Sequence, residues 1–330
     1  MIRRITSLVV AIAILAGLGA APALAATDQP GLCSNATTTS AKDTWLQGVI
    51  SANTDVDWFK FTTTSSRGVV VVLGDLPANY ALALYSTCSS AGLLATSDHG
   101  STSFEDVVMR LPAGTYRVKV WSSAGASSAT PYVVRFRSWP TGVHVTSARA
   151  WVDSSFERNL HVPGEVFNNT SSNRRLVRIT VRMYDAAGTL LGTAFNYAGL
   201  DVVGAGKRAP FHVAVETPLG YHHFTVSVTN SSTTTAKPVS GLRVSRGATT
   251  YDSIGLRHDY GTVTNTASTS VDSVRVFVSL HNRRGGVINA NYSYTGPIDL
   301  AAGQTGTYES LFGPPNTGVN RYRVYVDGDR

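Results

Sequence analysis

The second half of this chain contains one sequence twice, and the repetition limits the possible folds more than any other feature. Gly164-Glu-Val-Phe-Asn168 matches Gly261-Thr-Val-Thr-Asn265 at an offset of 97 residues. The same offset, without a gap, aligns Arg178 with Arg275, Val181 with Val278, Gly188 with Gly285, Phe195 with Tyr292, Tyr197 with Tyr294, Gly206 with Gly303, and Phe211 with Tyr308. One added residue then aligns 224–228 with 322–326. Two copies of one domain follow, each of about 90 to 100 residues, an ordinary size for a self-sufficient β-sandwich.

Local patterns in the first half predict strands. Residues 116–120 alternate apolar with cationic side chains, the period of two expected when one sheet face is buried and the other is wet. Residues 69–73 form a continuous apolar run of strand length, typical of a strand covered on both faces. Ala113-Gly114 supplies a turn. Several short strands at turn-punctuated intervals favour a sandwich or barrel over an α/β fold.

The sequence therefore predicts an all-β chain of three tandem antiparallel β-sandwich domains after a cleaved signal peptide. The expected boundaries are 1–25 for the signal peptide, 26–44 for an N-terminal segment tied by a disulfide, 45–139 for the first sandwich, 140–235 for copy 1 and 236–330 for copy 2, which is divergent. Short linkers at 138–142 and 230–238 separate the domains, so we expect a beaded, elongated particle.

Residues 1–25 have the layout of a secretory signal peptide. Two arginines precede an apolar run over 8–15, and Ala23-Leu-Ala25 is a small-residue cleavage site, so the segment is a signal peptide rather than a membrane span. The mature chain is expected to begin near Ala26, without a membrane span. No cysteine for lipid anchoring lies at the cleavage site, and the twin-arginine motif is incomplete. We therefore expect a secreted, extracellular protein exported by the Sec route, with no anchor.

The chain has two cysteines, Cys33 and Cys88. An even count in an oxidising compartment suggests one disulfide that ties the N-terminal segment to the first sandwich. A closed loop of about 55 residues would stabilise the fold by about 4 kcal/mol in the chain-entropy model. Two free thiols are the weaker alternative, because exposed thiols oxidise outside the cell. A thiol nucleophile is weaker still, since neither cysteine lies in a catalytic signature.

Four motifs of the first sandwich occur in the order typical of a known family. They are Asp55-Val-Asp-Trp-Phe-Lys-Phe61, Leu76-Pro-Ala-Asn-Tyr-Ala-Leu-Ala-Leu-Tyr85, Leu111-Pro-Ala-Gly-Thr-Tyr-Arg-Val-Lys-Val120 and Pro131-Tyr-Val-Val-Arg-Phe136. On these motifs the first sandwich resembles the bacterial and archaeal pre-peptidase C-terminal (PPC) domain. The resemblance implies a non-catalytic module of the kind often appended to secreted peptidases.

The same resemblance raises a calcium site, because some collagen-binding relatives hold calcium near the N-terminal linker. The candidate ligands are Asp55 and Asp57. The linker adds only Asp28 and Asp43, so few carboxylate ligands are available for an ion that takes about six to eight oxygens. The alternative is a turn-forming aspartate ahead of the Trp58 strand. Calcium is the only cofactor that the sequence suggests.

The two copies resemble the FxLYD family of small extracellular sandwich domains. In copy 1, Val181-Arg-Met-Tyr-Asp185 stands where that family has its Phe-x-Leu-Tyr-Asp signature. Copy 2 has Val278-Ser-Leu-His-Asn282, so a histidine and an asparagine replace the tyrosine and the aspartate. Asn282 can still start a turn, as Asp185 does. The resemblance implies a fold with no general activity attached.

One surface of the first sandwich is a candidate ligand-binding site. Strand alternation places Arg117, Lys119 and Trp121 on the face opposite the buried residues, so an exposed ring would lie beside two cations. Such a face suits stacking on a polymer and holding its carboxylate or sulfate groups. The alternative for Trp121 is a packing role at a domain junction.

The mature chain is basic without one focused patch. Removing the two signal-peptide arginines from the 28 Lys and Arg leaves 26 against 21 Asp and Glu, a balance of +5. The densest group is Arg174, Arg175, Arg178 and Arg182. A basic stripe there could meet an anionic polymer, but we favour a solvated sheet face that resists edge pairing. Secretion argues against nucleic acid as a partner.

Catalytic signatures are missing from the sequence: there is no His-Glu-x-x-His, no Gly-x-Ser-x-Gly and no pair of Cys-x-x-Cys.

We therefore expect a secreted, non-enzymatic β-sandwich protein that binds or adheres at the cell surface or to an extracellular polymer. Its partner would be a polysaccharide, a cell-wall polymer or a protein. The alternative is an accessory or targeting module of a secreted peptidase system. A hydrolase with an unrecognised site ranks third.

Overall fold

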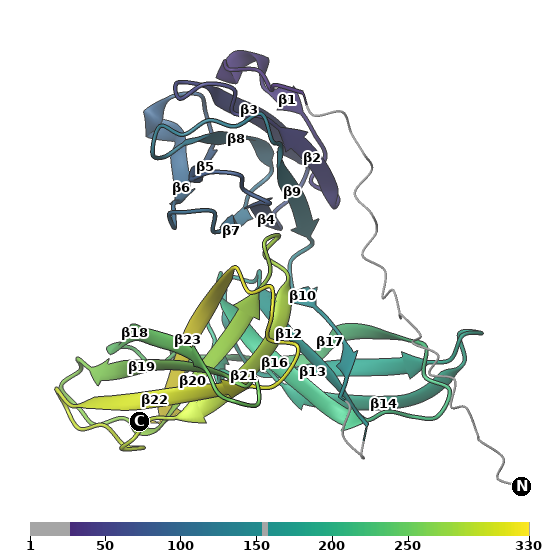
Figure 1. Cartoon of the computed structure of the whole chain (residues 1–330), viewed down its shortest axis with the longest axis vertical. Coiled ribbons are helices and arrows are strands. Elements are labelled where there is room, and N and C mark those ends of the chain that lie inside the picture. Colours follow the sequence, from purple (N-terminus) through teal and green to yellow (C-terminus); the bar gives the residue numbers. More distant parts are fainter. Residues whose placement is uncertain (1–26, 154–157, 330) are drawn as a thin grey trace, which may run out of the picture.

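The computed structural model describes residues 27–153 and 158–329, and the predicted signal peptide lies outside this range. The described residues form 23 strands and two 3-10 turns (Figure 1). The strands build three sandwiches in sequence order, each with two sheets, so the predicted all-β fold class is confirmed. Within the described ranges, no helix is long and apolar enough to cross a membrane.

The first sandwich comprises a five-stranded sheet, β1-β3-β8-β5-β6, and a four-stranded sheet, β2-β9-β4-β7. One pairing, between β1 and β3, is parallel. Phe61 and Phe136 meet in the core between the two sheets, with ring centroids 5.7 Å apart. The elements are η1 (Cys33–Asn35), β1 (Thr37–Thr38), β2 (Thr44–Gly48), β3 (Val56–Thr63), β4 (Arg67–Gly74), β5 (Tyr80–Tyr85), η2 (Ser90–Gly92), β6 (Leu93–Ser97), β7 (Glu105–Leu111), β8 (Gly114–Ser122) and β9 (Tyr132–Trp139).

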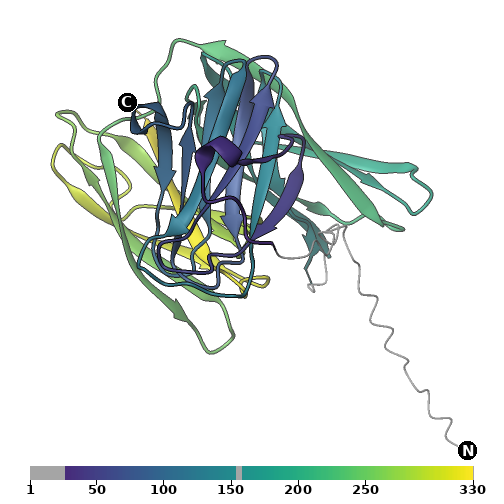
Figure 2. The same cartoon turned by 90° about the horizontal axis from the view of Figure 1, so that it is seen from above.

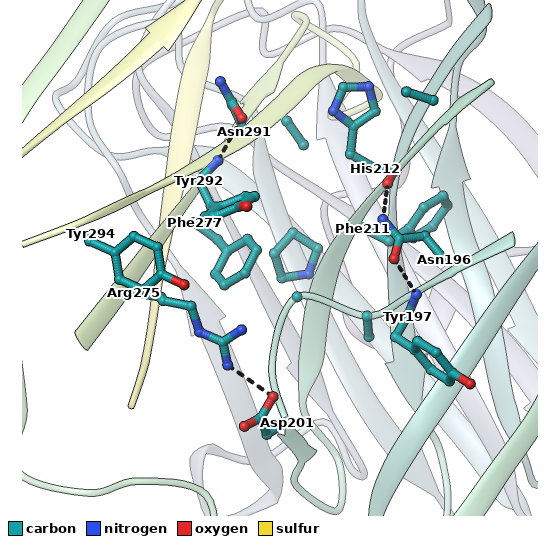
Figure 3. A pocket seen from close by; sticks show the side chains of 15 residues that line it. Asn196, Tyr197, Asp201, Phe211, His212, Arg275, Phe277, Asn291, Tyr292 and Tyr294 are labelled. Atoms are coloured by element: carbon teal, nitrogen blue, oxygen red, sulfur yellow. Dashed lines mark hydrogen bonds and ion pairs between the residues drawn. The ribbon is translucent and has the colours of Figure 1, made fainter. Parts of the chain in front are cut away.

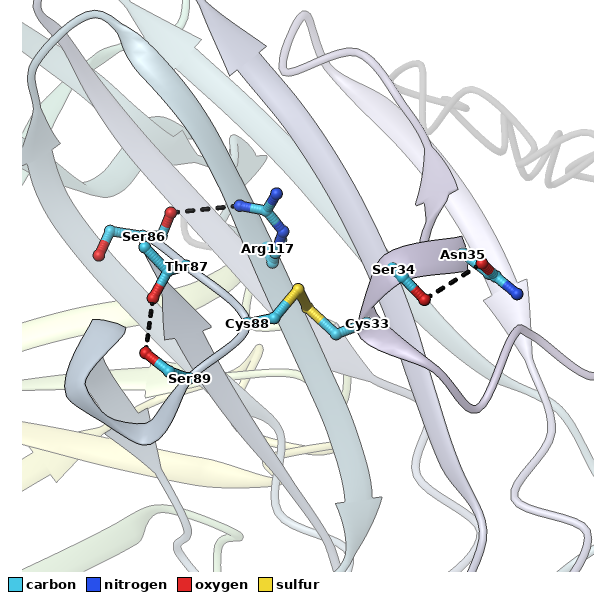
Figure 4. Close-up of a disulfide and its surroundings, with 8 residues drawn as sticks. All are labelled: Cys33, Ser34, Asn35, Ser86, Thr87, Cys88, Ser89 and Arg117. Carbon is cyan, nitrogen blue, oxygen red and sulfur yellow. Dashed lines mark hydrogen bonds between the residues drawn. A yellow bond between two sulfur atoms is a disulfide. The ribbon is translucent and has the colours of Figure 1, made fainter.

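The predicted disulfide is confirmed. Cys33 and Cys88 are bonded, with their Cα atoms 5.7 Å apart and a sequence separation of 55 residues. The bond joins η1 to the loop that follows β5, across the outer face of the five-stranded sheet (Figure 4). It therefore fastens the N-terminal segment over this face.

Copy 1 and copy 2 have matching architectures. In copy 1, β12 pairs with β10, β11 and β16, and β13 pairs with β14, β15 and β17. In copy 2 the sheets are β18-β19-β22 and β21-β20-β23. The strands of copy 1 are β10 (Val143–Ala148), β11 (Trp151–Val152), β12 (Asn159–Asn168), β13 (Asn173–Tyr184), β14 (Leu190–Tyr197), β15 (Val202–Val203), β16 (Arg208–Glu216) and β17 (His223–Thr234). Those of copy 2 are β18 (Leu242–Tyr251), β19 (Arg257–Asn265), β20 (Asp272–His281), β21 (Val287–Tyr294), β22 (Thr305–Phe312) and β23 (Arg321–Asp329).

The repeated asparagine performs the same task in both copies. The side-chain amide of Asn168 donates to the carbonyl oxygens of Ser172 and Val203, each at 2.9 Å. Asn265 donates to the carbonyls of Thr269 and Leu300, at 2.8 and 2.9 Å. Both asparagines are fully buried. Each one satisfies loop carbonyls that would otherwise be buried without a donor, which explains why the motif ends in this residue.

The repeated glycine makes room for an aromatic ring. A Cβ atom on Gly164 would lie 2.3 Å from the Phe211 ring, and one on Gly261 would lie 2.5 Å from the Tyr308 hydroxyl. Any side chain at either position would displace a core ring, so only glycine fits.

The first sandwich docks on both copies through a buried ionic cluster. Asp106 accepts hydrogen bonds from Arg321 and Arg323 of copy 2, both at 2.7 Å, and from Arg208 of copy 1. Glu165 of copy 1 accepts from Arg323 at 2.6 Å and from the Tyr325 hydroxyl. Burial alone would raise the pKa of Asp106, but the three guanidinium groups hold it well below its usual range.

The expectation of a beaded, elongated particle is wrong. The first sandwich lies above the junction between the copies in Figure 1 and covers that junction in Figure 2, which looks down from above. The loop before β7 contacts the start of β23. The connections between the domains are short, at 140–142 and 235–241, although residues 230–234 of the predicted second linker belong to β17. The lengths of these connections contain no information about the charges that join the domains. Docking follows from residues such as Asp106 and Arg323, which are 217 positions apart.

Removing the disulfide tests its contribution. We expect the double substitution Cys33→Ser/Cys88→Ser to lower the free energy of unfolding by about 4 kcal/mol, because the unfolded chain regains the freedom of a closed loop. Denaturant unfolding of the oxidised wild type and the variant measures the difference. Equal midpoints for the two proteins would contradict a stabilising role.

Removing one charge tests the docking. Asp106→Asn leaves three guanidinium groups without their shared anion, and breaking a buried ion pair typically costs about 3 to 5 kcal/mol. We expect a lower thermal midpoint and a larger radius of gyration by small-angle X-ray scattering. Asp272→Asn is the matched control, since Asp272 is exposed and forms no ion pair among the described residues. Unchanged scattering and melting in the Asp106 variant would refute the proposed role of the cluster.

Candidate binding site

A cleft of about 480 Å³ lies between copy 1 and copy 2 (Figure 3). Strands β14 and β16 form one wall, and β20 and β21 form the other. The volume is within the range of ordinary ligand pockets, which is about 300 to 1,000 Å³. The lining residues are Asn196, Tyr197, Ala198, Gly199, Asp201, Pro210, Phe211, His212, Ala214, Arg275, Phe277, Ala290, Asn291, Tyr292 and Tyr294.

Aromatic rings dominate the copy 2 wall. Tyr292 and Tyr294 stand two residues apart on β21, so both point to the same side of the sheet. Their centroids are 6.1 Å apart in an edge-to-face arrangement, and each ring is about half exposed. Phe277 on β20 lies opposite Tyr292 in the strand register, with centroids 5.3 Å apart. These rings offer flat apolar surface with hydroxyls at its rim.

The two walls meet where Phe277 of copy 2 rests on Gly199 of copy 1. A Cβ atom on Gly199 would lie 2.5 Å from the Phe277 ring, so a larger residue would push the copies apart. Arg275 of copy 2 donates to Asp201 of copy 1 at 2.9 Å, which closes one side of the cleft. Although burial alone would lower the pKa of Arg275, its hydrogen bond to Asp201 raises that pKa.

Two asparagines hold the backbone at Tyr197 and Tyr292. The Asn196 amide donates to the His212 carbonyl at 2.8 Å and its side-chain oxygen accepts from the Tyr197 backbone. Asn291 donates to the Leu311 carbonyl at 2.8 Å and accepts from the Tyr292 backbone. The backbone that carries Tyr197 and Tyr292 is therefore held before any ligand arrives, which lowers the entropy cost of binding.

His212 in the cleft is uncharged near neutral pH, and both of its ring nitrogens have partners. Burial, together with the neighbouring His161, lowers the pKa of His212 to about 4. Its ring nitrogens face His161 at 3.0 Å and the Ala290 backbone. Because both nitrogens have partners, His212 has no free nitrogen with which to exchange protons with a ligand.

The face predicted from the sequence is formed as expected by strand alternation. Tyr116, Val118 and Val120 are buried on one side of β8. On the other side, Lys119 lies 5.3 Å from the Trp121 ring centroid. Trp121 is only half-buried, so the ring and this cation do share one surface.

Arg117 is held more tightly than the sequence suggests. Its guanidinium lies beside the Cys33–Cys88 bond and donates to the Ser86 carbonyl at 3.2 Å (Figure 4). Its Nε is buried without a partner. The Arg117 guanidinium is thus engaged by the loop after β5, and ligand binding by the three residues stays a prediction.

The candidate calcium ligands are close together, and Asp28 joins them. Carboxylate oxygens of Asp28, Asp55 and Asp57 lie within 4.8 Å of one another, whereas Asp43 pairs with Arg135 instead. Burial, with the charges of Asp55 and Asp28, raises the pKa of Asp57 to about 7 against its hydrogen bond from a tyrosine. Asp55 lies in a turn, but Asp57 is fully buried inside β3, so the turn-forming alternative fits only Asp55.

This cluster fits a divalent cation in charge but not in the number of free oxygens. The two carboxylate oxygens of Asp57 already accept hydrogen bonds from the Gln29 backbone and from the Tyr132 hydroxyl. Asp28 and Asp55 would therefore supply most of the protein oxygens, and calcium takes about six to eight in total. Calcium at this position stays a prediction.

Asp57 predicts a pH effect on stability. Because its pKa is raised in the folded protein, its contribution to stability is complete below about pH 4 and is lost as the pH rises through about 7. We expect the thermal midpoint of the wild type to fall more between about pH 5 and pH 8 than that of Asp57→Asn. Parallel pH profiles of the two proteins would contradict the raised pKa.

Comparison with known proteins gives only distant likenesses. No protein-family model matches the sequence, and no curated protein matches it. Among solved structures, the pre-peptidase C-terminal domain of a Bacillus anthracis collagenase is similar over 32% of this chain and 94% of its own, with 13% identity and a TM-score of 0.25. This likeness does not establish membership of the family.

Two sugar-cleaving enzymes are similar to longer stretches. A Parabacteroides merdae β-glucuronidase matches 78% of this chain with 11% identity and a TM-score of 0.30. An Amycolatopsis orientalis exo-chitosanase matches 61% with 14% identity and a TM-score of 0.31. This chain spans only 28% and 27% of the lengths of those two proteins. The PPC and FxLYD assignments therefore remain resemblances.

Sequence reasoning missed the cleft although its rings were visible. The repeat alignment already pairs Phe195 with Tyr292 and Tyr197 with Tyr294, which indicates that each copy has an aromatic pair on one strand. The alignment does not show how the copies dock. Docking brings Tyr197 of copy 1 and Tyr294 of copy 2 into one cleft.

Proposed function

We propose that this protein is a secreted, non-enzymatic binding protein whose cleft between the copies holds an extracellular glycan. The observation that carries the proposal is the pair of half-exposed, edge-to-face rings, Tyr292 and Tyr294, that line a cleft of about 480 Å³. A pyranose presents C–H groups on its faces and hydroxyls at its edge. Its faces pack on aromatic rings, while its hydroxyls hydrogen-bond to phenol and amide groups at the rim.

The chemistry of the cleft favours binding over cleavage. Glycoside hydrolysis generally uses two carboxyl groups that flank the scissile bond. The cleft lining has one carboxylate, Asp201, and it is paired with Arg275. The lining has no serine, cysteine or lysine for nucleophilic attack, and His212 has partners at both nitrogens. These features support a non-enzymatic role.

Binding of the mature protein to cellulose, chitin, peptidoglycan and soluble polysaccharides tests the proposal. We expect Tyr292→Ala and Tyr294→Ala each to weaken binding of the preferred glycan about tenfold, equivalent to about 1.4 kcal/mol. Isothermal titration calorimetry or affinity electrophoresis measures the change. Both rings are half exposed, so neither substitution should lower the melting temperature much.

Tyr260→Ala is the matched control, because Tyr260 is a partly exposed tyrosine on β19 that stacks on His258 outside the cleft. Trp121→Ala separates the cleft from the face of the first sandwich. If Trp121→Ala abolishes binding while both cleft variants bind like the wild type, the site lies on the first sandwich and the cleft is not the binding site.

A further inference from the structure

The cleft opens onto a second aromatic surface on the outside of copy 1. We call it the copy 1 outer face and define it by five residues, Arg178, Arg182, Tyr184, Phe195 and Tyr197. The alternate residues of β13 point inward, since Ile179, Val181 and Met183 are buried in the copy 1 core. The five residues therefore project from the solvent side of the β14-β13-β17 sheet.

This face repeats the aromatic pair of the cleft. Phe195 and Tyr197 lie 6.1 Å apart in an edge-to-face arrangement, as Tyr292 and Tyr294 do in copy 2. Phe195 and Tyr197 are 50% and 44% exposed. Tyr197 also lines the cleft, so the aromatic surface continues from the cleft onto the outer face. A linear polymer that leaves the cleft would meet a further ring beside it.

The arginine beside each aromatic pair has a different environment in the two copies. Arg178 faces Tyr197 in the strand register, and Arg275 faces Tyr294 in the same way. Arg275 is neutralised by Asp201 at 2.9 Å, with Asp327 at 3.7 Å. The repeat alignment places Thr229 where copy 2 has Asp327. The copy 1 arginine therefore lacks that counter-charge.

Two cations of the copy 1 outer face have no carboxylate partner. Neither Arg178 nor Arg182 forms an ion pair with any described residue. The neighbouring carboxylates have other partners, since Asp185 accepts from the Thr189 backbone and Asp201 from Arg275. The Arg178 guanidinium carbon lies 3.6 Å from the Phe195 ring centroid, and its Nε is buried without a hydrogen-bond acceptor.

We propose that the glycan is a linear acidic polysaccharide that runs from the cleft onto the copy 1 outer face; this inference rests on the proposed function. Its sugar rings stack on Tyr197 and Phe195, and its carboxylate or sulfate groups bind Arg178 and Arg182. A guanidinium presents a planar fork of donors that matches a carboxylate, and it keeps this geometry while stacked on an aromatic ring. The two arginines thus favour a ligand that carries negative charge. The aromatic rings alone would not distinguish an acidic polysaccharide from a neutral one.

The test compares polygalacturonate with the neutral polymer made by reducing its carboxyl groups. We expect the wild type to bind polygalacturonate at least about tenfold more tightly at low salt, with the difference shrinking as salt screens the charges. Arg178→Gln/Arg182→Gln should weaken polygalacturonate binding about tenfold and leave binding of the neutral polymer within about twofold. Arg178→Lys/Arg182→Lys should recover part of the loss, because it restores charge without the fork.

Arg110→Gln/Arg243→Gln is the control for overall charge, since it removes two exposed arginines on other domains. Equal binding of both polymers by the wild type, with Tyr292→Ala weakening both, would overturn the acidic preference and leave the proposed function intact. Failure of the wild type to bind any glycan would overturn both. Equal losses in the outer-face and control variants would show a general charge effect and would also overturn the inference.

Discussion

The buried cluster around Asp106 and Glu165 fixes the arrangement of all three domains. Both carboxylates are almost completely excluded from water, and three arginines from two domains surround Asp106. Placing charges in the interior carries a large desolvation cost, which only well-oriented partners offset. A cluster that lacks one partner therefore destabilises the docked arrangement more than a junction without charges would. We expect the domains to dock with the complete cluster or not at all. The cleft depends on this constraint, since its two walls belong to different copies.

The repeats have diverged at the residues that join them. Glu165 of copy 1 corresponds to Thr262 in copy 2, and Arg323 of copy 2 corresponds to Thr225 in copy 1. Each copy therefore keeps one half of the docking chemistry, and the outer face of copy 1 has Thr225 where copy 2 has Arg323. On that face Arg178 forms no ion pair with a described residue. Strands β20 and β21 thus form one wall of the cleft, while the equivalent strands β13 and β14 carry the copy 1 outer face.

Much of the fold and part of the candidate site could be predicted from the sequence. Alternation placed Trp121 opposite Val118, and the offset of 97 residues identified two domains with matching turns at Asp185 and Asn282. The bond between Cys33 and Cys88 followed from cysteine count and compartment. These predictions succeeded because strand alternation and disulfide bonding depend on local residue order or on the number of cysteines. Both can be read directly from the sequence.

Other features were decided only by tertiary structure. Asp28 joins Asp55 and Asp57 because the disulfide-linked segment lies along β3, and the Arg117 guanidinium is engaged by the loop after β5. The cleft exists because residues more than 100 positions apart neutralise one another, as Glu165 and Arg323 do. Strand alternation says which side of a sheet a residue occupies. It does not say which charge from another domain will meet it, because that pairing is set by complementary surfaces and by the desolvation cost of leaving either charge alone.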